Sequence, residues 1–145
     1  MQQLLGRVRR CIEDYRMIEA GDRIAVGVSG GKDSLVTLLA LARLRRFLPT
    51  PFTLEAITLE MGMPEMDYTP VAQLCEELDV PYTRINVPVY EILFEERKEK
   101  NPCALCAKMK RGILCDTAVE MGCELLALAH HKDDLIDTFL LNLFY

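Results

Sequence analysis

The chain has 145 residues, of which 50% are hydrophobic and 27% are charged, and this suits a single soluble globular domain with a buried core. The longest apolar runs are interrupted by charged residues, so none approaches the roughly 20 residues of a membrane span, and the N-terminus lacks a signal-peptide cleavage site. A formal net charge of −5 argues against a nucleic-acid-binding surface over the whole molecule, although it permits local basic patches.

Hydrophobic periodicity predicts that helices and strands alternate along the chain. In chain order we expect a helix at 7–18, a strand at 24–28, a helix at 35–47, a strand at 52–59, a helix at 68–78, a strand at 82–87, a short helix at 89–99, a helix at 107–121, a strand at 125–129 and a helix at 133–143. This alternation predicts an α/β fold, a doubly wound and mostly parallel sheet with helices on both faces. Residues 1–145 then form one domain with an N-terminal helix over 1–18 leading in. Because the last predicted helix has no cap, we expect the C-terminal part of the domain to be missing.

A glycine-rich turn, Ser29-Gly-Gly-Lys-Asp-Ser34, follows the first predicted strand and opens the next helix. In doubly wound sheets, ligands bind beyond the carboxyl ends of the strands. Gly30 and Gly31 allow the backbone to approach a bulky anion, which the helix N-terminus then faces. Lys32 adds a mobile charge, the last serine a hydroxyl donor, and Asp33 a carboxylate that caps the helix or holds Mg²⁺. The pattern favours a phosphate site over an ordinary strand-to-helix turn.

A second polar segment, His130-His-Lys-Asp-Asp134, follows the last predicted strand and therefore shares a sheet edge with the glycine-rich turn. The imidazole of His130 and the carboxylates of Asp133 and Asp134 are suited to Mg²⁺, to phosphate oxygens or to orienting reacting groups. A structural interpretation competes with this one, because the helix dipole favours acidic residues at a helix N-terminus. The shared edge favours function.

The cysteine pair Cys103-Ala-Leu-Cys106 is predicted to lie in a loop that opens a helix, within a basic patch. Positive surroundings and a helix N-terminus lower the pKa of a thiol and favour the thiolate, which binds metal or attacks sulfur. A redox dithiol, a structural zinc site and an iron–sulfur cluster are the alternatives, and the chain lacks the second such pair that zinc would need. The remaining cysteines suit small core positions: Cys11, Cys75, Cys115 and Cys123. Six cysteines without a secretion signal indicate thiols or metal ligands and a cytoplasmic protein.

The glycine-rich turn, the cysteine pair followed by Lys110-Arg-Gly112, and the His-Asp segment occur in this order, which resembles the tRNA 2-thiocytidine synthetase family of PP-loop ATP pyrophosphatases. The segments at 15–24 and 138–145 are also similar to that family, so the resemblance covers nearly the whole chain. It implies an ATP-dependent tRNA sulfurtransferase. Such an enzyme adenylates the C2 oxygen of cytidine 32 and replaces it with sulfur by means of a [4Fe–4S] cluster.

The resemblance also assigns roles to particular residues. Ser29–Ser34 would bind the ATP phosphates with Mg²⁺, and Cys103 and Cys106 would be two of three ligands of the [4Fe–4S] cluster, the third lying beyond residue 145. Cys103 and Cys106 would thereby take part in catalysis. Independently of the resemblance, the shared sheet edge makes Asp33, His130, Asp133 and Asp134 candidate catalytic residues. The implied partners are tRNA and a sulfur donor such as a cysteine desulfurase, with a homodimer left open and no membrane. Two alternatives remain: a truncated, non-catalytic ATP-binding module, and another PP-loop enzyme such as tRNA lysidine synthetase, which lacks the cysteine pair.

Overall fold

The computed structural model of the protein describes residues 1–62, 66–87, 102–131 and the single positions 136, 140 and 143, without the side chains of 102–105. The helix predicted at 89–99, the residues Asp133 and Asp134, and most of the helix predicted at 133–143 lie outside the described residues. The helices are α1 (Gln2–Asp14), α2 (Lys32–Leu44), α3 (Thr69–Glu77) and α5 (Pro102–Glu120), and the strands are β1 (Arg23–Gly27), β2 (Thr53–Glu60), β3 (Tyr82–Asn86) and β4 (Leu125–Ala127). None of these helices has the length and apolar character of a membrane-spanning segment.

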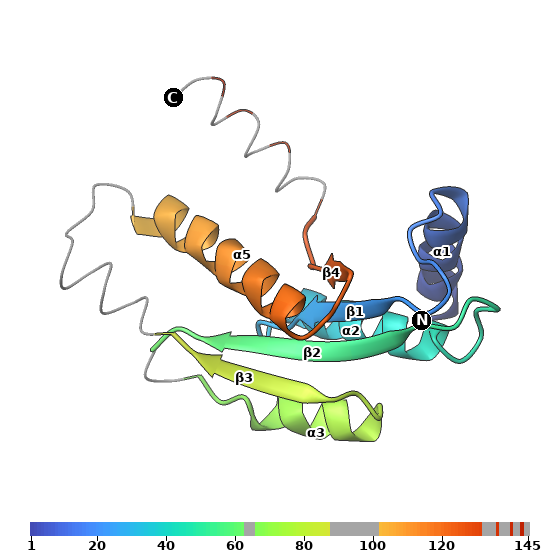
Figure 1. The fold of residues 1–145 in the computed structure, drawn as a ribbon, viewed down its shortest axis with the longest axis horizontal. Helices are drawn as coiled ribbons and strands as arrows, with labels where there is room; N and C mark the ends of the chain where they lie inside the picture. Colours follow the sequence, from blue (N-terminus) through green and yellow to red (C-terminus); the bar gives the residue numbers. More distant parts are fainter. Residues whose placement is uncertain (63–65, 88–101, 132–135, 137–139, 141–142, 144–145) are drawn as a thin grey trace.

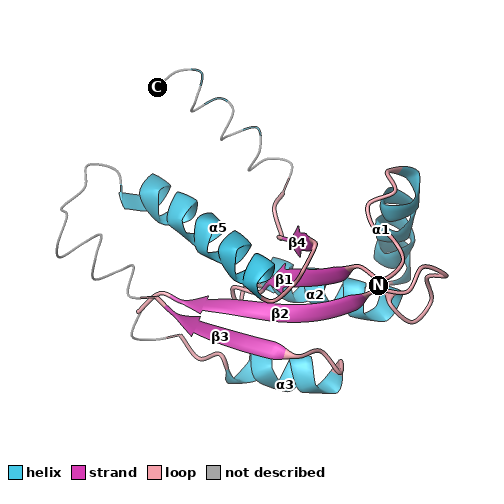
Figure 2. Cartoon of the chain, viewed as in Figure 1, coloured by secondary structure: helices cyan, strands magenta, loops and turns pink. Residues whose placement is uncertain are grey.

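The four strands form one sheet in the order β3-β2-β1-β4, and every neighbouring pair is parallel (Figure 2). The pairing of β1 with β2 ends at Gly27 opposite Ile57, and β4 pairs with the other side of β1 from Ile24 to Val26. The chain therefore moves outward from β1 to β3 and then returns across β1 to place β4. This reversal makes the gap between β1 and β4 the topological switch point of the sheet, where ligands bind in open α/β folds.

Alternating residues of the strands pack against helices on opposite faces of the sheet. Val26 and Leu54 join a cluster with α1, α2 and α3 on one face. Ala25 and Ile57 pack on the other face against Ala118 of α5. Figure 1 shows α3 and α5 on opposite sides of the sheet. The predicted α/β fold, with a parallel sheet and helices on both faces, is thus confirmed.

Several element boundaries differ from those predicted, and local backbone chemistry explains the differences. α1 ends at Asp14 rather than at residue 18, because Arg16 adopts a left-handed conformation with φ of 48°. α2 begins at Lys32 because Gly31, in an extended conformation, serves as its N-cap. The prediction that the cysteine pair lies in a loop is wrong: α5 begins at Pro102, so the cysteines are helical. Proline is favoured at the first helical position, since its fixed φ suits a helix and its missing N–H has no partner there.

The four remaining cysteines divide into buried and exposed pairs. Cys75 and Cys123 are buried at 1% and 8% exposure, as expected of core residues. Cys11 and Cys115 are exposed, so their prediction as core residues is wrong. Cys115 lies on the outward face of α5, whose other face covers the sheet. Cys11 lines an apolar groove with Val8 and Ile12 of α1 and is exposed there.

Candidate phosphate-binding site

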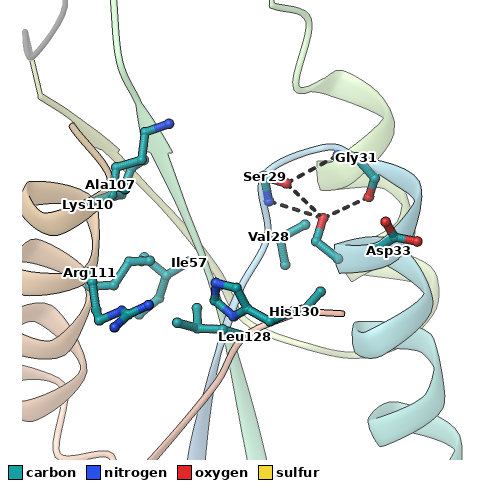
Figure 3. A pocket seen from close by; sticks show the side chains of 15 residues that line it. Val28, Ser29, Gly31, Asp33, Ile57, Ala107, Lys110, Arg111, Leu128 and His130 are labelled. Carbon is teal, nitrogen blue, oxygen red and sulfur yellow. Dashed lines mark hydrogen bonds between the residues drawn. The ribbon is translucent and has the colours of Figure 1, made fainter. Parts of the chain in front are cut away.

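A cavity of about 360 Å³ lies at the switch point of the sheet, where the loop after β1 meets the loop after β4. One wall is formed by the glycine-rich turn and the start of α2, and the opposite wall by α5 (Figure 3). Ile57 and Leu59 of β2 supply apolar surface between them, and Leu128–His130 complete the site. The cavity therefore combines an apolar floor with polar walls, as small-molecule sites commonly do.

The buried hydroxyl of Ser34 organises the glycine-rich turn. Ser34 is 4% exposed, and its hydroxyl donates to the carbonyl of Gly31 at 2.8 Å. It also accepts hydrogen bonds from the backbone N–H of Ser29 at 3.2 Å and from the hydroxyl of Ser29 at 3.3 Å. Gly30 has φ of 84°, the left-handed region that glycine enters without strain. Since the Ser34 proton is directed to Gly31, this serine holds the turn in shape rather than offering the free donor that we expected.

A second set of hydrogen bonds, from β2 and β3, holds the backbone at Val28, directly before the glycine-rich turn. Val28 lies one residue past the end of the β1–β2 pairing, and its carbonyl accepts a hydrogen bond of 2.7 Å from the hydroxyl of Thr58. Thr58 has no solvent exposure and in turn accepts a hydrogen bond of 2.9 Å from the hydroxyl of Tyr82. Burial raises the pKa of Tyr82 above its ordinary value, which keeps it a neutral donor. The peptide unit between Val28 and Ser29 is consequently held at its C=O by Thr58 and at its N–H by Ser34.

The two loops at the switch point are linked by an interaction between His131 and Asp33. Nε2 of His131 lies 3.0 Å from Oδ2 of Asp33, and the contact is an ion pair when the imidazole is protonated. Asp33 also lines the cavity, as does His130 from the loop after β4. The predicted convergence of the two segments on one sheet edge is thus seen at Asp33, His130 and His131. Asp133 and Asp134 lie outside the described residues.

The cationic side chains that face the cavity come from α5. Lys110 and Arg111 line it, and Figure 3 shows the Arg111 side chain directed toward His130. Lys32, the lysine that we expected at the phosphate, is exposed on the first turn of α2 and does not line this cavity. The sequence signal for Lys110 was present, because this lysine falls on the inward-facing stripe of α5 with Met109 and Ile113. The sequence indicates a basic patch beside the cysteine pair, but it does not by itself place Lys110 and Arg111 at the phosphate site.

The cysteine pair lies beside the cavity on the same helix. Cys106 is half-buried and packs against an apolar cluster around Met61, and the next residue, Ala107, lines the cavity. Cys103 precedes Cys106 by three residues, a spacing that brings two positions to one face of a helix. Among the described residues no group of three or more His, Cys, Asp and Glu is arranged to hold a metal ion. The pair is therefore suited to part of a cluster's ligand set and not to a complete one.

The model of the PP-loop domain family matches residues 3–145. The chain is 43% identical over 135 residues to the tRNA-cytidine(32) 2-sulfurtransferase of Alkalilimnicola ehrlichii, covering 92% of this chain and 43% of the relative. It is also 43% identical over 145 residues to the enzyme of that name from Pelobacter propionicus, covering 99% of this chain and 54% of the relative. The chain thus spans about half the length of these curated relatives.

Two solved structures have the same fold. The U34-tRNA thiolase NcsA from Methanococcus maripaludis, solved with its [4Fe–4S] cluster, aligns with a TM-score of 0.79 and 26% identity over 97% of this chain and 48% of that one. The NH3-dependent NAD synthetase from Campylobacter jejuni aligns with a TM-score of 0.66 and 15% identity over 92% of this chain and 58% of that one. The second likeness concerns the fold alone.

Proposed function

The chain belongs to the PP-loop domain family, and we propose that it is the ATP-binding part of a tRNA sulfurtransferase that makes 2-thiocytidine at position 32 of tRNA. The observation that carries this proposal is the cavity at the switch point. There the clamped Ser29–Ser34 turn faces Lys110 and Arg111 across a space of about 360 Å³. The names and 43% identity of the relatives from Alkalilimnicola and Pelobacter support the choice of reaction and of nucleotide.

In the proposed reaction, the C2 oxygen of cytidine attacks the α-phosphorus of ATP, and the bond from this phosphorus to the leaving pyrophosphate breaks. The backbone N–H groups of the Ser29–Ser34 turn hold the phosphates, as helix N-termini do. Lys110 and Arg111, which line the cavity, offset the charge that develops on pyrophosphate, and Lys32 adds its mobile charge from the first turn of α2. Sulfide then forms a bond to C2 as the C2–oxygen bond breaks, and AMP leaves with that oxygen.

Two groups implied by this function have candidate ligands in the chain. Asp33, with Asp133 and Asp134, would bind Mg²⁺ together with the ATP phosphates, because Mg²⁺ sites use one or two carboxylates plus substrate oxygens. Cys103 and Cys106 would supply two of the thiolates that hold a [4Fe–4S] cluster. The cluster would carry the sulfur that replaces oxygen. His130 and His131 would orient Asp33 and the reacting groups.

The proposed partners follow from the reaction. The enzyme uses tRNA as substrate and takes sulfur from a donor such as a cysteine desulfurase. It acts in the cytoplasm, where tRNA is modified, and a homodimer is compatible with this arrangement.

A test separates ATP binding from sulfur transfer. Wild-type chain should bind ATP in calorimetry, whereas Gly31→Val, which adds a side chain where the phosphate approaches, should weaken binding at least tenfold, or about 1.4 kcal/mol. For sulfur transfer, a hybrid joins residues 1–145 to the C-terminal half of the Pelobacter propionicus relative. After anaerobic reconstitution we expect this hybrid to hold iron and sulfide, and the 145-residue chain to hold them poorly.

The hybrid should also convert unmodified tRNA to a product containing 2-thiocytidine, measured by mass spectrometry of nucleosides. Cys103→Ser and Cys106→Ser should abolish the cluster and thiolation while leaving ATP affinity unchanged, because the phosphates are held by a different part of the sheet edge. Thiolation that persists without either cysteine would refute the sulfur-transfer role. ATP binding that is insensitive to Gly31→Val would refute the assignment of the turn.

A further inference from the structure

Helix α5 has an outward face that carries exposed cations and a glycine, and the cavity does not account for all of these residues. From Ala107 to Glu120, the exposed positions follow a helical stripe, and the half-buried and buried ones form the opposite stripe that packs on the sheet. At the cavity end, the exposed stripe carries Lys108, Arg111 and Gly112. Figure 1 shows α5 as the outer layer on its side of the sheet. This surface is continuous with the cavity, because Arg111 is exposed and also lines it.

Helix stability does not account for these cations. Lys108, Lys110 and Arg111 lie in the middle turns of α5, beyond the terminal turns where the helix dipole acts on a charge, so the dipole does not favour them there. Their placement concentrates positive charge beside the cavity. In a chain of net charge −5, such a concentration indicates an anionic partner.

Gly112 gives an independent indication that something approaches this face closely. Glycine inside a helix is less favourable than alanine, because it loses more backbone conformational freedom on folding. Gly112 is exposed, and a Cβ added to it would meet no heavy atom within 4 Å, so packing within the described part of the protein does not require glycine there. It lies one turn after Lys108, and residues four apart are neighbours on a helix surface. A missing side chain beside exposed cations suits the backbone of a polyanion.

We propose that the face of α5 formed by Lys108, Arg111 and Gly112 is the surface on which the sugar–phosphate backbone of the tRNA substrate lies next to its reacting nucleotide. The inference rests on the proposed function, since it specifies where that substrate docks. Lys108 contacts a phosphate of the tRNA, and Arg111 marks the border where this surface meets the cavity. Gly112 lets the backbone approach the helix within the space that a side chain would fill.

The test measures binding of the 145-residue chain to an unmodified tRNA transcript with cytidine at position 32, by fluorescence anisotropy without ATP. Gly112→Ala should raise thermal stability, because alanine is the better helix former, yet weaken tRNA binding roughly tenfold. Lys108→Gln should also weaken binding and reduce the slope of log affinity against log salt by about one.

Matched controls come from α1, which packs against α2. Gly6 is likewise an exposed helical glycine with nothing within 4 Å of an added Cβ, and Arg9 is an exposed cation. Gly6→Ala and Arg9→Gln should leave tRNA affinity unchanged. The proposal is overturned if Gly112→Ala and Lys108→Gln bind like wild type, if the α1 variants weaken binding equally, or if the wild-type chain binds no tRNA. ATP calorimetry on the same proteins distinguishes failure of this proposal from failure of the proposed function. If the wild-type chain does not bind ATP, the proposed function is contradicted, whether or not the chain binds tRNA.

Discussion

Replacing Thr58 by valine removes a hydroxyl from the centre of the sheet while keeping the volume and β-branched shape of the side chain. The change breaks the 2.7 Å bond to the carbonyl of Val28 and the 2.9 Å bond from Tyr82. Each polar group left buried without a partner costs about 1–3 kcal/mol. Thr58 has no exposure, but Tyr82 is half-buried, so water can partly satisfy its hydroxyl. We therefore expect the free energy of unfolding to fall by roughly 2–3 kcal/mol.

The same substitution should affect the ligand site, because the carbonyl of Val28, which directly precedes the glycine-rich turn, loses its hydrogen bond from Thr58. We expect ATP affinity to fall roughly tenfold at a temperature where the variant is still folded. Urea denaturation measures the stability loss, and calorimetry measures the affinity. Thr58→Ser should restore much of both, since it keeps the hydroxyl. Thr37→Val is the matched control: its hydroxyl bonds the carbonyl of Asp33 within its own helix, so its loss should cost less than about 1 kcal/mol.

The expected loss of stability depends on energetic coupling between the Tyr82–Thr58 and Thr58–Val28 hydrogen bonds. A double-mutant cycle measures this coupling. Tyr82→Phe alone should cost about 1 kcal/mol, and it should cost almost nothing further in a Thr58→Val background, because its partner is already absent. The opposite outcome is that Thr58→Val has the same urea midpoint as wild type and binds ATP with the same affinity. In that case the hydrogen bond to the Val28 carbonyl contributes nothing to stability or to binding, and the prediction is refuted.

Two further predictions concern titratable groups. Burial raises the pKa of the Cys75 and Cys123 thiols, so in timed alkylation at neutral pH both should react far more slowly than the exposed cysteines of α1 and α5; equal labelling rates by mass spectrometry would contradict the burial described here. The backbone N–H of Arg23 donates to Glu124 at 2.7 Å and lowers the pKa of that carboxyl. The contribution of the Glu124 carboxylate to the free energy of unfolding is therefore present above the ordinary pKa of 4.5. It is lost as pH falls through the lowered pKa of the folded protein. Glu124→Gln should flatten the acid limb of the stability–pH curve, and an unchanged limb would exclude this carboxylate as its source.

The sequence was sufficient to predict the fold because β1 is a short apolar run, buried at Ile24, Ala25 and Val26, and because strand and helix periods alternate along the chain. Both are local properties. It also located the glycine-rich turn, since the left-handed conformation of Gly30, with φ of 84°, favours glycine at that point of the backbone. The position of β4 next to β1 was not readable from any local pattern. It follows from the right-handed crossover of α5 over the far face of the sheet, a property of the whole chain.

The site was predicted less completely than the fold. The sequence placed the glycine-rich turn and His130 at one sheet edge, but it did not identify Lys110 as the half-buried cation across the cavity. Lys110 lies on the inward-facing stripe of the helix wherever the helix begins, but the cavity that it lines forms only when α5 packs across from the Ser29–Ser34 turn. Pro102 also starts α5 five residues before the predicted boundary. With the helix assumed to begin at residue 107, Cys103 and Cys106 were expected in a loop. The roles of all these residues in catalysis stay predictions.

The parallel pairing of β1 with β4 also determines the order in which the molecule can assemble. Arg23 and Glu124, which meet where these strands begin, are 101 residues apart in the chain. Closing so long a loop is slow and entropically costly, whereas β1, β2 and β3 follow one another closely and can associate first. During synthesis, the glycine-rich turn and its clamp are in place before the second half of the cavity exists. A nascent chain that has not yet released β4 from the ribosome therefore has the turn but no complete pocket to close around a nucleotide.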